Sequence, residues 1–335
     1  MTNPVLVEAT RGSLAECLYR GAFALVDGDG RVVRSEGDIE RLVFPRSAIK
    51  VFQAIPLIET GAADRFALSD AELALACASH SGEPGHVVRA EGMLAKAGLD
   101  SSRLECGCHW PFDFPVAIDL AKTGENPTPL HNNCSGKHAG FLCTAIHEGE
   151  DQAGYVAADH PVQRRGRQVI EDLTETELGA DVCGTDGCSI PTYAAPLRSF
   201  AHGFAKLLSG KGVDANRAKA GQRLIAACMA HPWEMSGTKR ACLRLMEAAP
   251  ARVFAKTGAD GVYCGAIPEL GLGFALKIDD GATRAAESLA AAVIAEAFRA
   301  SDPALAKVYD GLARTILKNW EKIEVGEVRP VVSGR

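Results

Sequence analysis

Segments that resemble β-strands lie at both ends of this sequence, and segments that resemble helices fill the middle. Apolar runs predict strands over residues 5–10, 16–27, 31–37, 251–258, 262–270 and 273–280. Turns rich in glycine and aspartate separate consecutive strands, which is typical of antiparallel hairpins. We therefore predict an α+β fold, in which the N- and C-terminal strands form a single antiparallel sheet and a helical region is inserted between them.

The periodicity of apolar residues predicts helices throughout the inserted region. The clearest helix start is at Ser69, because Glu72 three residues later completes a capping box. Other helices are expected over residues 47–61, 86–98, 138–148, 161–173, 192–208, 214–230, 238–248, 282–299 and 303–318. Residues 105–138 look mostly irregular, and residues 325–335 look like a last strand or a loose tail.

No internal repeat or low-complexity linker marks a domain boundary. We therefore expect one domain over residues 1–335, with a helical subregion at roughly 60–250.

The composition argues against several classes of partner. The formal net charge is −6, and no run of basic residues is interleaved with aromatic ones, so neither nucleic acid nor an anionic membrane surface is expected to bind. The N-terminus lacks the basic and apolar regions of a secretory signal, and no stretch approaches the ~20 apolar residues of a membrane span. We expect a cytoplasmic protein.

Eleven cysteines are many for a protein of this length. In a reducing compartment they are expected to be thiols that fill the core, bind metal or act as nucleophiles. Apolar or helical surroundings favour a core position for Cys17, Cys77, Cys143, Cys228 and Cys242, whereas segments rich in Gly, Asn, Asp and Pro contain Cys106, Cys108, Cys134, Cys183 and Cys188. Paired C-x-x-C units are absent, which argues against a zinc finger.

The segment FPRSAIKVF places Ser47 three residues before Lys50 at the head of an apolar run. One interpretation is a helix start, with Ser47 as the capping residue and Lys50 on the solvated side. The other is a serine nucleophile with a neutral lysine as its base, since residues three apart lie on one face of a helix. The second interpretation requires dry surroundings or a neighbouring cation for the lysine.

Two further elements favour the catalytic interpretation. The tripeptide KTG, from Lys256 to Gly258, ends a predicted strand, and Ser79 follows an apolar helix in the string SHSGEPGH. The S-x-x-K pattern and KTG match two of the three elements of the penicillin-recognising serine enzymes, and the string of Ser79 lies between them, where the third element is expected. Lys256 can supply the positive charge beside Lys50, or form a second pair with Ser79 that relays protons to the leaving group.

Arg46 is a candidate for binding a substrate carboxylate, because its planar fork matches two oxygens. The alternative is a surface charge next to a proline.

Four extended strings carry a resemblance to a known family: RSAIK, ASHSGEPGH, HNNCSGKHAG and CGTDGCSIP. With them the sequence resembles the L-asparaginases of rhizobial type over nearly its whole length. The resemblance implies the fold shared with serine β-lactamases and glutaminases, and an activity that hydrolyses L-asparagine to L-aspartate and ammonia. A homodimer is also implied.

The resemblance further implies particular site residues. Ser47 with Lys50 and Ser79 with Lys256 match the two catalytic serine–lysine pairs, and the zinc ligands of the family match Cys134, Lys137 and Cys188. Asp186 and His80, in the same strings, are expected to contact substrate, whereas His138 is not a family ligand and is expected to bond a loop carbonyl. Cys106, Cys108 and His109 resemble a ligand cluster but lack a fourth partner.

Two alternatives remain at this stage. One is a glutaminase or another amidohydrolase on the same scaffold, because asparagine and glutamine differ by one methylene. The other is a binding protein for amino acids or metal that has lost catalysis, which the presence of both serines and both lysines disfavours.

Overall fold

The computed structural model describes residues 2–331 of the chain. Contacts between Cα atoms divide the chain into two compact units. Unit 1 contains residues 1–48, 194–211 and 245–335, and unit 2 contains residues 49–193 and 212–244. Each unit is therefore built from segments that are distant in the sequence.

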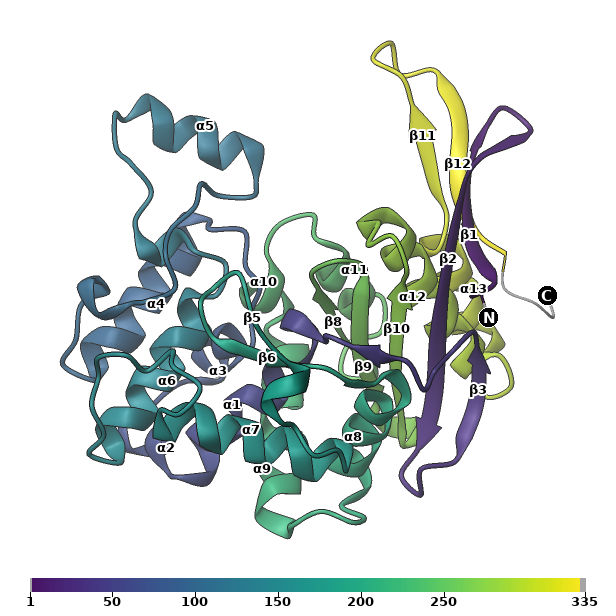
Figure 1. The fold of residues 1–335 in the computed structure, drawn as a ribbon. Coiled ribbons are helices and arrows are strands. Elements are labelled where there is room, and N and C mark those ends of the chain that lie inside the picture. Colours follow the sequence, from purple (N-terminus) through teal and green to yellow (C-terminus); the bar gives the residue numbers. More distant parts are fainter. Residues whose placement is uncertain (1, 332–335) are drawn as a thin grey trace. The chain divides into compact units, whose positions relative to one another are not determined.

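Unit 1 is organised around an antiparallel sheet with the strand order β11-β12-β1-β2-β10-β9-β8, and β3 pairs with β2 beside this path (Figure 1). The strands are β1 (Val5–Arg11), β2 (Leu14–Asp27), β3 (Val32–Glu36), β8 (Phe254–Gly258), β9 (Val262–Ile267), β10 (Leu272–Ile278), β11 (Thr315–Lys318) and β12 (Glu324–Pro330). The long strand β2 joins the two halves of the sheet, because its first half pairs with β1 and its second half pairs with β10. This confirms the predicted α+β class and the sheet built from both ends of the chain.

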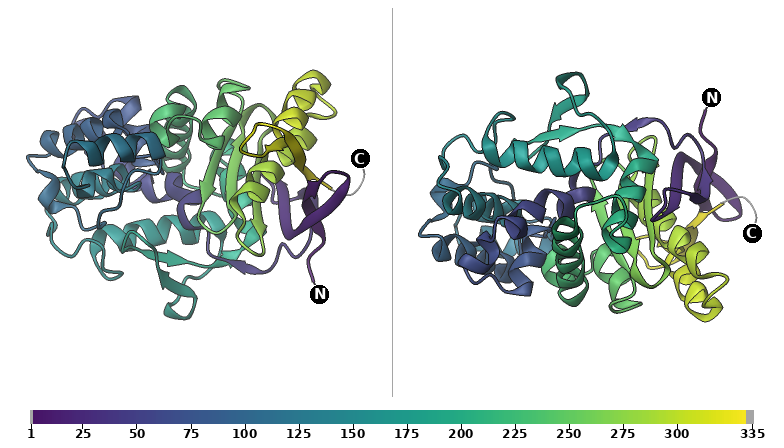
Figure 2. Two further views of the ribbon diagram at one scale, coloured as in Figure 1. Left: turned by 90° about the horizontal axis from the view of Figure 1, so that it is seen from above. Right: turned by 90° about the horizontal axis from the view of Figure 1, so that it is seen from below.

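Helices cover the central strands of this sheet on both faces. Every residue of β9 is buried, and so is almost every residue of β10, which requires apolar cover above and below the sheet. The cover comes from α8 (Leu197–Ser209) on one face and from α12 (Thr283–Phe298), with α13 (Pro303–Leu312) packed on it, on the other (Figures 1 and 2). A two-stranded ribbon of β4 (Leu42–Val43) and β7 (Ala195–Pro196) completes unit 1.

Unit 2 is helical, and α1 (Lys50–Glu59) lies at its centre. Its first eight residues are all buried, as expected for a helix surrounded by others. It contacts α6 (Ser135–His147), α7 (Pro161–Thr174) and α9 (Ala215–Ala230). The remaining elements are α2 (Ala62–Arg65), α3 (Asp70–Ala76), α4 (Pro84–Lys96), α5 (Phe114–Lys122), α10 (Pro232–Ser236), β5 (Cys183–Thr185) and β6 (Pro191–Tyr193), and α11 (Ala241–Glu247) leads back into unit 1. Within the described part of the chain, none of the helices has the length and apolar character needed to cross a bilayer.

Several predicted boundaries are wrong. The helix expected over residues 303–318 ends at Leu312, and β11 follows it. Residues 105–138 are not all irregular, because Asp113 caps α5 by accepting the N–H of Val116. The helix expected from residue 192 begins at Leu197, after two short strands. Residues 324–330 do form a strand, whereas residues 332–335 lie outside the described part of the chain.

The capping box of α3 is confirmed and provides a first test of stability. The Ser69 hydroxyl accepts the N–H of Glu72, and Glu72 Oε2 accepts the Ser69 N–H at 2.7 Å and the Lys96 ammonium at 2.6 Å. We expect Ser69→Ala to lower the free energy of unfolding by about 1 kcal/mol, because a helix donor loses its partner. Urea unfolding followed by circular dichroism measures this change.

The same cluster gives a pH dependence. Burial opposes ionisation of Glu72, but the ammonium of Lys96 and the donors of Ser69 outweigh it and lower its pKa below the usual 4.5. The stabilisation is therefore complete above about pH 4.5 and is lost as the pH falls through the lower folded value. We expect Glu72→Gln to be less stable than the wild type at pH 7 and to lose this difference in acid, and an equal difference at both pH values would contradict the assignment.

Candidate active site

The predicted nucleophile Ser47 lies in a short turn of unit 1. Residues Arg46–Ile49 form a 3-10 helix that leads directly into α1, and Ser47 is half-buried within it. The N-cap position of α1 is taken by Ile49, and no side chain in the described chain caps this helix. The interpretation of Ser47 as a helix cap is therefore wrong, and its hydroxyl needs another explanation.

The KTG strand of unit 1 packs directly against the turn that carries Ser47. A Cβ atom on Gly258 would lie 2.6 Å from the carbonyl oxygen of Pro45 and 3.2 Å from the amide nitrogen of Ala48. Only glycine allows two stretches of backbone to come this close. The sequence elements RSAIK and KTG, more than 200 residues apart, are thus neighbours in unit 1.

Lys256, at the centre of β8, is completely buried, and its ammonium donates to the carbonyl of Thr257 at 2.8 Å. Across the sheet it is paired with Cys264 of β9. A fully buried lysine is uncommon in proteins and requires a specific partner or function.

Arg46 forms an ion pair with Asp260, a residue that the sequence analysis did not select. Both residues have positive φ angles, 51° for Arg46 and 57° for Asp260, which is strained for side chains other than glycine. The prediction that Arg46 binds a substrate carboxylate remains compatible with this pair, because a guanidinium has five N–H donors and can serve two carboxylates.

Lys50 is the central polar residue of unit 2. It is fully buried at the first position of α1. Its Nζ atom contacts the carbonyl oxygen of Ala78, the hydroxyl of Ser79 at 3.1 Å and the sulfur of Cys134 at 3.0 Å. Desolvating an amine in this way is costly unless such partners surround it, so the contacts explain how Lys50 is accommodated in the core.

Ser79 follows α3 in a buried segment without regular secondary structure. Its N–H donates to the carbonyl of Met235 at 3.1 Å, and its hydroxyl meets Lys50. Sequence reasoning paired Ser79 with Lys256, and within unit 2 the lysine at this serine is Lys50. The pairing with Lys256 stays a prediction.

The three residues predicted to bind zinc lie together in unit 2. Cys134, Lys137 and Cys188 are each at most 3% exposed. Cys134 and Lys137 come from the start of α6, and Cys188 comes from the β5–β6 loop. The Lys137 ammonium lies 3.0 Å from the Cys188 sulfur, and the two cysteines are hydrogen-bonded to each other.

The charges of this cluster are interdependent. A hydrogen bond from the Cys188 thiol, helped by Lys50 and Lys137, holds the pKa of Cys134 well below its usual range despite burial. The same hydrogen bond and burial raise the pKa of Cys188. Burial alone would lower the pKa of Lys137, but the sulfurs and then Asp186 outweigh it and raise the pKa. Without metal, the cluster is therefore a thiolate, a thiol and an ammonium.

This donor set fits zinc. Two sulfurs and one amine nitrogen are soft ligands of the kind that select Zn²⁺, and they converge in a dry site, where a metal can replace the protons of Cys188 and Lys137. Among residues 2–331, no group of three or more His, Cys, Asp or Glu side chains is arranged to hold a metal ion. The predicted set differs from such groups because its third ligand is a lysine.

His80 is buried, and both of its ring nitrogens are used. Nδ1 accepts the N–H of Gly82 at 3.1 Å, so Nε2 carries the proton and donates to the hydroxyl of Ser135 at 2.9 Å. Burial, followed by His86 and Lys50, lowers the pKa of His80 well below its usual value, so the ring is neutral. The predicted role of His80 in substrate binding stays a prediction, and these bonds give it a clear structural role.

His138 has a different partner from the one predicted. The Tyr155 hydroxyl accepts the N–H of Glu105 at 2.9 Å and is hydrogen-bonded to Nδ1 of His138 at 2.7 Å. The expectation of a loop carbonyl as partner is therefore wrong. The ligand-like cluster near residue 106 is also dispersed, because Cys106 is buried against Pro129 while Cys108 is exposed.

Asp186 lies at the tip of the β5–β6 loop, two residues before Cys188. Its carboxylate accepts the N–H of Gly187 at 2.8 Å and contributes to the raised pKa of Lys137. Asp186 is thus placed on the rim of the thiol cluster, where an amino group can reach it.

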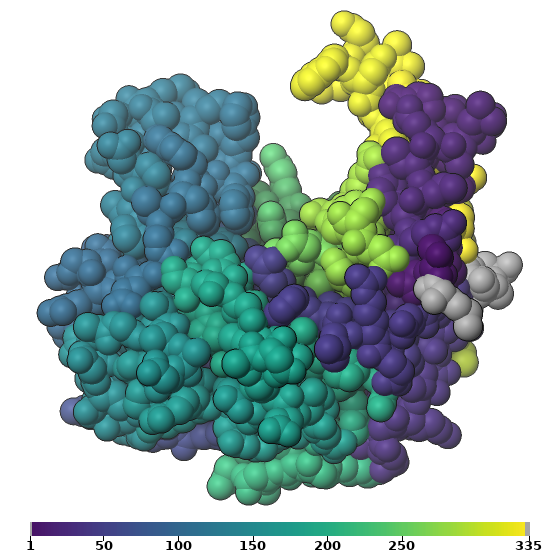
Figure 3. All heavy atoms as spheres, in the orientation of Figure 1, coloured from purple at the N-terminus to yellow at the C-terminus, as the bar shows by residue number. Residues whose placement is uncertain are grey.

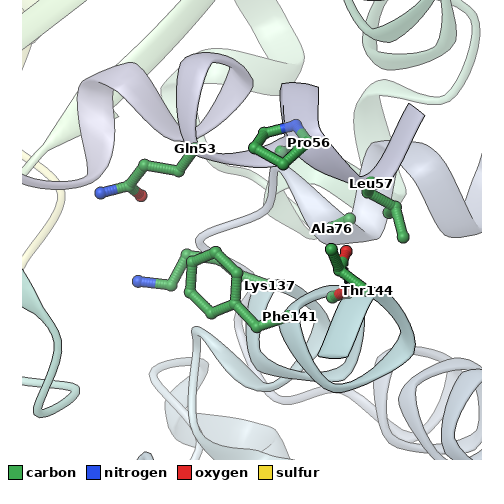
Figure 4. A pocket seen from close by; sticks show the side chains of 9 residues that line it. Gln53, Pro56, Leu57, Ala76, Lys137, Phe141 and Thr144 are labelled. Carbon is green, nitrogen blue, oxygen red and sulfur yellow. Dashed lines mark hydrogen bonds between the residues drawn. The ribbon is translucent and has the colours of Figure 1, made fainter. Parts of the chain in front are cut away.

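A cavity of about 10 Å³ lies beside this cluster, between α1 and α6 (Figure 4). This volume matches one water molecule. The amide of Gln53 and the ammonium of Lys137 project toward the same side of it, and Oε1 of Gln53 is buried without a hydrogen-bond partner in the described residues. A water at this position would satisfy Gln53.

The structure therefore brings the predicted residues together within each unit. In unit 1 the turn of Arg46 and Ser47 meets the strand of Lys256, and in unit 2 Lys50, Ser79 and the three predicted zinc ligands cluster. Sequence reasoning missed Asp260, which lies in the turn between two predicted strands, and Ser135, which lies in the quoted string HNNCSGKHAG. No sequence pattern marks these two residues, because only the fold shows which polar group each of them contacts.

Comparison with known proteins identifies the class. A model of the L-asparaginase II family matches residues 7–330, which is nearly the whole chain, so this protein is an amidohydrolase. More particularly, the chain belongs to the L-asparaginase II family. This confirms the resemblance drawn from the sequence strings. No curated protein sequence matches the chain.

Solved structures show weaker similarity. A β-lactamase from Mycobacterium bovis is 16% identical, with a TM-score of 0.39 over 83% of this chain and 94% of that chain. Mglu in its tris and glutamate form is 17% identical, with a TM-score of 0.38 over 89% of this chain and 63% of that chain. Another Mglu structure is 18% identical, with a TM-score of 0.39 over 89% and 71% of the two chains.

Proposed function

We propose that this protein hydrolyses L-asparagine to L-aspartate and ammonia through a serine nucleophile activated by lysine. The observation that supports this most is the buried amine of Lys50, which contacts the hydroxyl of Ser79 at 3.1 Å and lies three residues after Ser47. Family membership supports the choice of an amide as substrate.

Lys50 has the hydrogen-bonding geometry of a shared base. Its Nζ atom donates toward three acceptors, which are the carbonyl of Ala78, the sulfur of Cys134 and the hydroxyl of Ser79. Acting as a base, Lys50 accepts the proton of Ser47 on its nitrogen and gives one of its own N–H protons to the Ser79 oxygen, and Ser79 passes its hydroxyl proton on to the leaving nitrogen.

The reaction then has two stages. Ser47 attacks the side-chain amide carbon while Lys50 accepts its proton, and backbone N–H groups beside Ser47 and along the KTG strand stabilise the oxyanion. Ser79, with Lys256, gives a proton to the amide nitrogen of the tetrahedral intermediate, which leaves as ammonia, and water then hydrolyses the acyl-enzyme. The substrate carboxylate is held by Arg46 and its α-amino group by Asp186.

Cys134, Lys137 and Cys188 hold a zinc ion in this proposal. When bound, the metal supplies a fixed positive charge that orients the substrate. The nucleophile Ser47 is not one of the three ligands, and the metal would act on its base only through the 3.0 Å contact between Lys50 and Cys134.

Removal of zinc is expected to weaken substrate binding more than it slows the chemical step. Cys188→Ala is expected to raise KM by about 10- to 100-fold with a smaller change in kcat, because an orienting group is lost while Cys134, the ligand that contacts Lys50, is kept. Steady-state ammonia release with and without a chelator measures both constants.

Since zinc must displace the protons of Cys188 and Lys137, the affinity of the protein for zinc is also expected to rise with pH. Equal affinity at pH 6 and pH 8 would argue against this ligand set.

The experiment that tests the function compares ammonia release from L-asparagine and L-glutamine with the purified protein. One methylene is worth about 1–3 kcal/mol, so a selective site should prefer asparagine by about 10- to 200-fold in kcat/KM. A preference for glutamine would establish the glutaminase alternative. The non-catalytic alternative is set aside, because the family is one of amidohydrolases.

We also infer a homodimer. Two hairpins of unit 1 carry exposed apolar side chains, and the β11–β12 hairpin projects from the surface (Figure 3). Trp320 at its tip is 99% exposed, and Leu14 at the β1–β2 tip is 76% exposed. Ile316 and Ile323 of the β11–β12 hairpin are exposed as well, and an apolar surface that extends over neighbouring residues marks an interaction site. Light scattering should give twice the monomer mass, and Trp320→Glu should reduce it to the monomer mass.

A further inference from the structure

We propose that the hydrogen-bonded pair of Glu83 and Thr238, which we call the latch, holds Ser79 in position, although Ser79 is not part of the pair. This inference rests on the proposed function, in which Ser79 protonates the leaving group. The latch acts through the buried segment Ser79–Glu83, and all of its contacts lie within unit 2.

The segment Ser79–Glu83 depends on its neighbours for its conformation. It forms neither helix nor strand up to Glu83, yet Ser79, His80 and Ser81 are at most 5% exposed. Buried backbone and side-chain polar groups outside regular structure need partners elsewhere in the fold. The position of Ser79 is therefore set by those partners rather than by a helix or sheet.

One short segment supplies two of these partners. Met235 accepts the N–H of Ser79 at 3.1 Å, and the carbonyl of Ser236 accepts the Ser81 hydroxyl at 3.3 Å. Gly237 follows with a φ of 111°, and a Cβ atom there would lie 2.5 Å from the Ser81 hydroxyl. The segment 235–238 thus fits closely against the segment of Ser79, and a shift in one moves the other.

The latch joins the last residues of the two segments, Glu83 and Thr238. The carboxylate of Glu83 accepts the N–H of Thr238 at 2.7 Å and its hydroxyl at 2.6 Å. These bonds are short and charge-assisted, and they hold the segments 79–83 and 235–238 in a fixed alignment. The Thr238 hydroxyl in turn accepts the indole N–H of Trp233 at 3.0 Å.

Trp233 connects Thr238 to the segment Ser79–Glu83 by a second route. Its ring stacks on His86 with centroids 4.1 Å apart, and His86 stacks on His80 at 4.9 Å. The His86 ring also donates from Nε2 to the carbonyl of Trp233 at 3.1 Å. Ser79 and the residues that follow it, as far as His86, are therefore tied to the segment 233–238.

The latch lies at the surface, whereas the serine that it holds is buried. Thr238 is exposed, so replacing its hydroxyl opens no cavity in the core and the protein is expected to fold normally. A misplacement of a reacting group by about 1 Å can reduce the rate about 100-fold. A surface substitution that changes turnover without changing stability is the signature of a positioning role.

The test uses the full chain with zinc present and compares Thr238→Val with Thr238→Ser. Valine keeps the shape of threonine but cannot donate to Glu83, whereas serine keeps the hydroxyl. We expect Thr238→Val to lower kcat by about 10-fold or more with little change in KM and Tm, and Thr238→Ser to retain most of the wild-type kcat. Glu83→Ala should behave like the valine variant.

Hydrogen exchange of the peptide that contains Ser79–Glu83 gives a readout independent of activity. We expect faster exchange in Thr238→Val than in the wild type or in Thr238→Ser. Wild-type kcat together with wild-type exchange in Thr238→Val would overturn the latch, and so would a loss of kcat that only parallels a loss of Tm. If Ser79→Ala instead keeps full activity, the role of Ser79 in the proposed function fails, while the exchange data still decide whether the latch exists.

Discussion

Replacing Ser47 with alanine is expected to reduce ammonia release from L-asparagine by about 10,000-fold or more, because the attacking hydroxyl is lost. The fold should be unaffected, since Ser47 does not cap α1 and is only half-buried. A coupled ammonia assay at saturating zinc measures the rate, and thermal unfolding checks the fold.

Two further variants make this result specific. Ser102 is an exposed serine in another turn, so Ser102→Ala should have wild-type activity. Ser79→Ala removes the group that protonates the leaving nitrogen and should slow formation of the acyl-enzyme by about 100- to 10,000-fold. Mass spectrometry of a quenched reaction of the wild-type enzyme should locate the adduct on the peptide of Ser47. An adduct on the peptide of Ser79 in the wild-type enzyme would assign the nucleophile to Ser79 instead.

Substitution of Gly258 by alanine is expected to reduce kcat by about 100-fold without contacting the substrate. The added methyl would lie 2.6 Å from the carbonyl oxygen of Pro45 and 3.3 Å from the Cβ of Ala48. The added methyl must push the turn and the KTG strand apart, and either shift changes the position of Ser47 relative to the strand. The measurement is kcat at saturating asparagine, together with the free energy of unfolding.

Gly311 provides the matched control in the same unit. It lies near the end of α13, and an added Cβ would meet no atom within 4 Å. Gly311→Ala should therefore retain activity and gain about 0.5–1 kcal/mol in stability, because alanine favours the helix. If Gly258→Ala were as active as this control, the close contact between the KTG strand and the Ser47 turn would have no catalytic importance.

Local patterns in the sequence were sufficient for the fold class and for several elements. Strand periodicity at both ends of the chain predicted the antiparallel sheet, since alternation of side chains is a property of the strand itself. The capping box of Ser69 and Glu72 was predicted for the same reason, because both partners lie within one turn. The boundary between α13 and β11 was not, because residues 313–318 are compatible with either structure until β12 pairs with them.

The candidate site divides along the same line. The sequence by itself was sufficient to predict candidate residues for the chemistry, from Ser47 and Lys50 to Cys134 and Cys188, because these residues occur in extended strings of a recognisable family. Only the tertiary structure decided that Lys50 contacts Ser79 and Cys134 together, and that Asp260 pairs with Arg46. The physical reason is distance along the chain. Spacing within a segment fixes a helix face or a cap, whereas a contact between residues tens or hundreds of positions apart exists only after the core has packed.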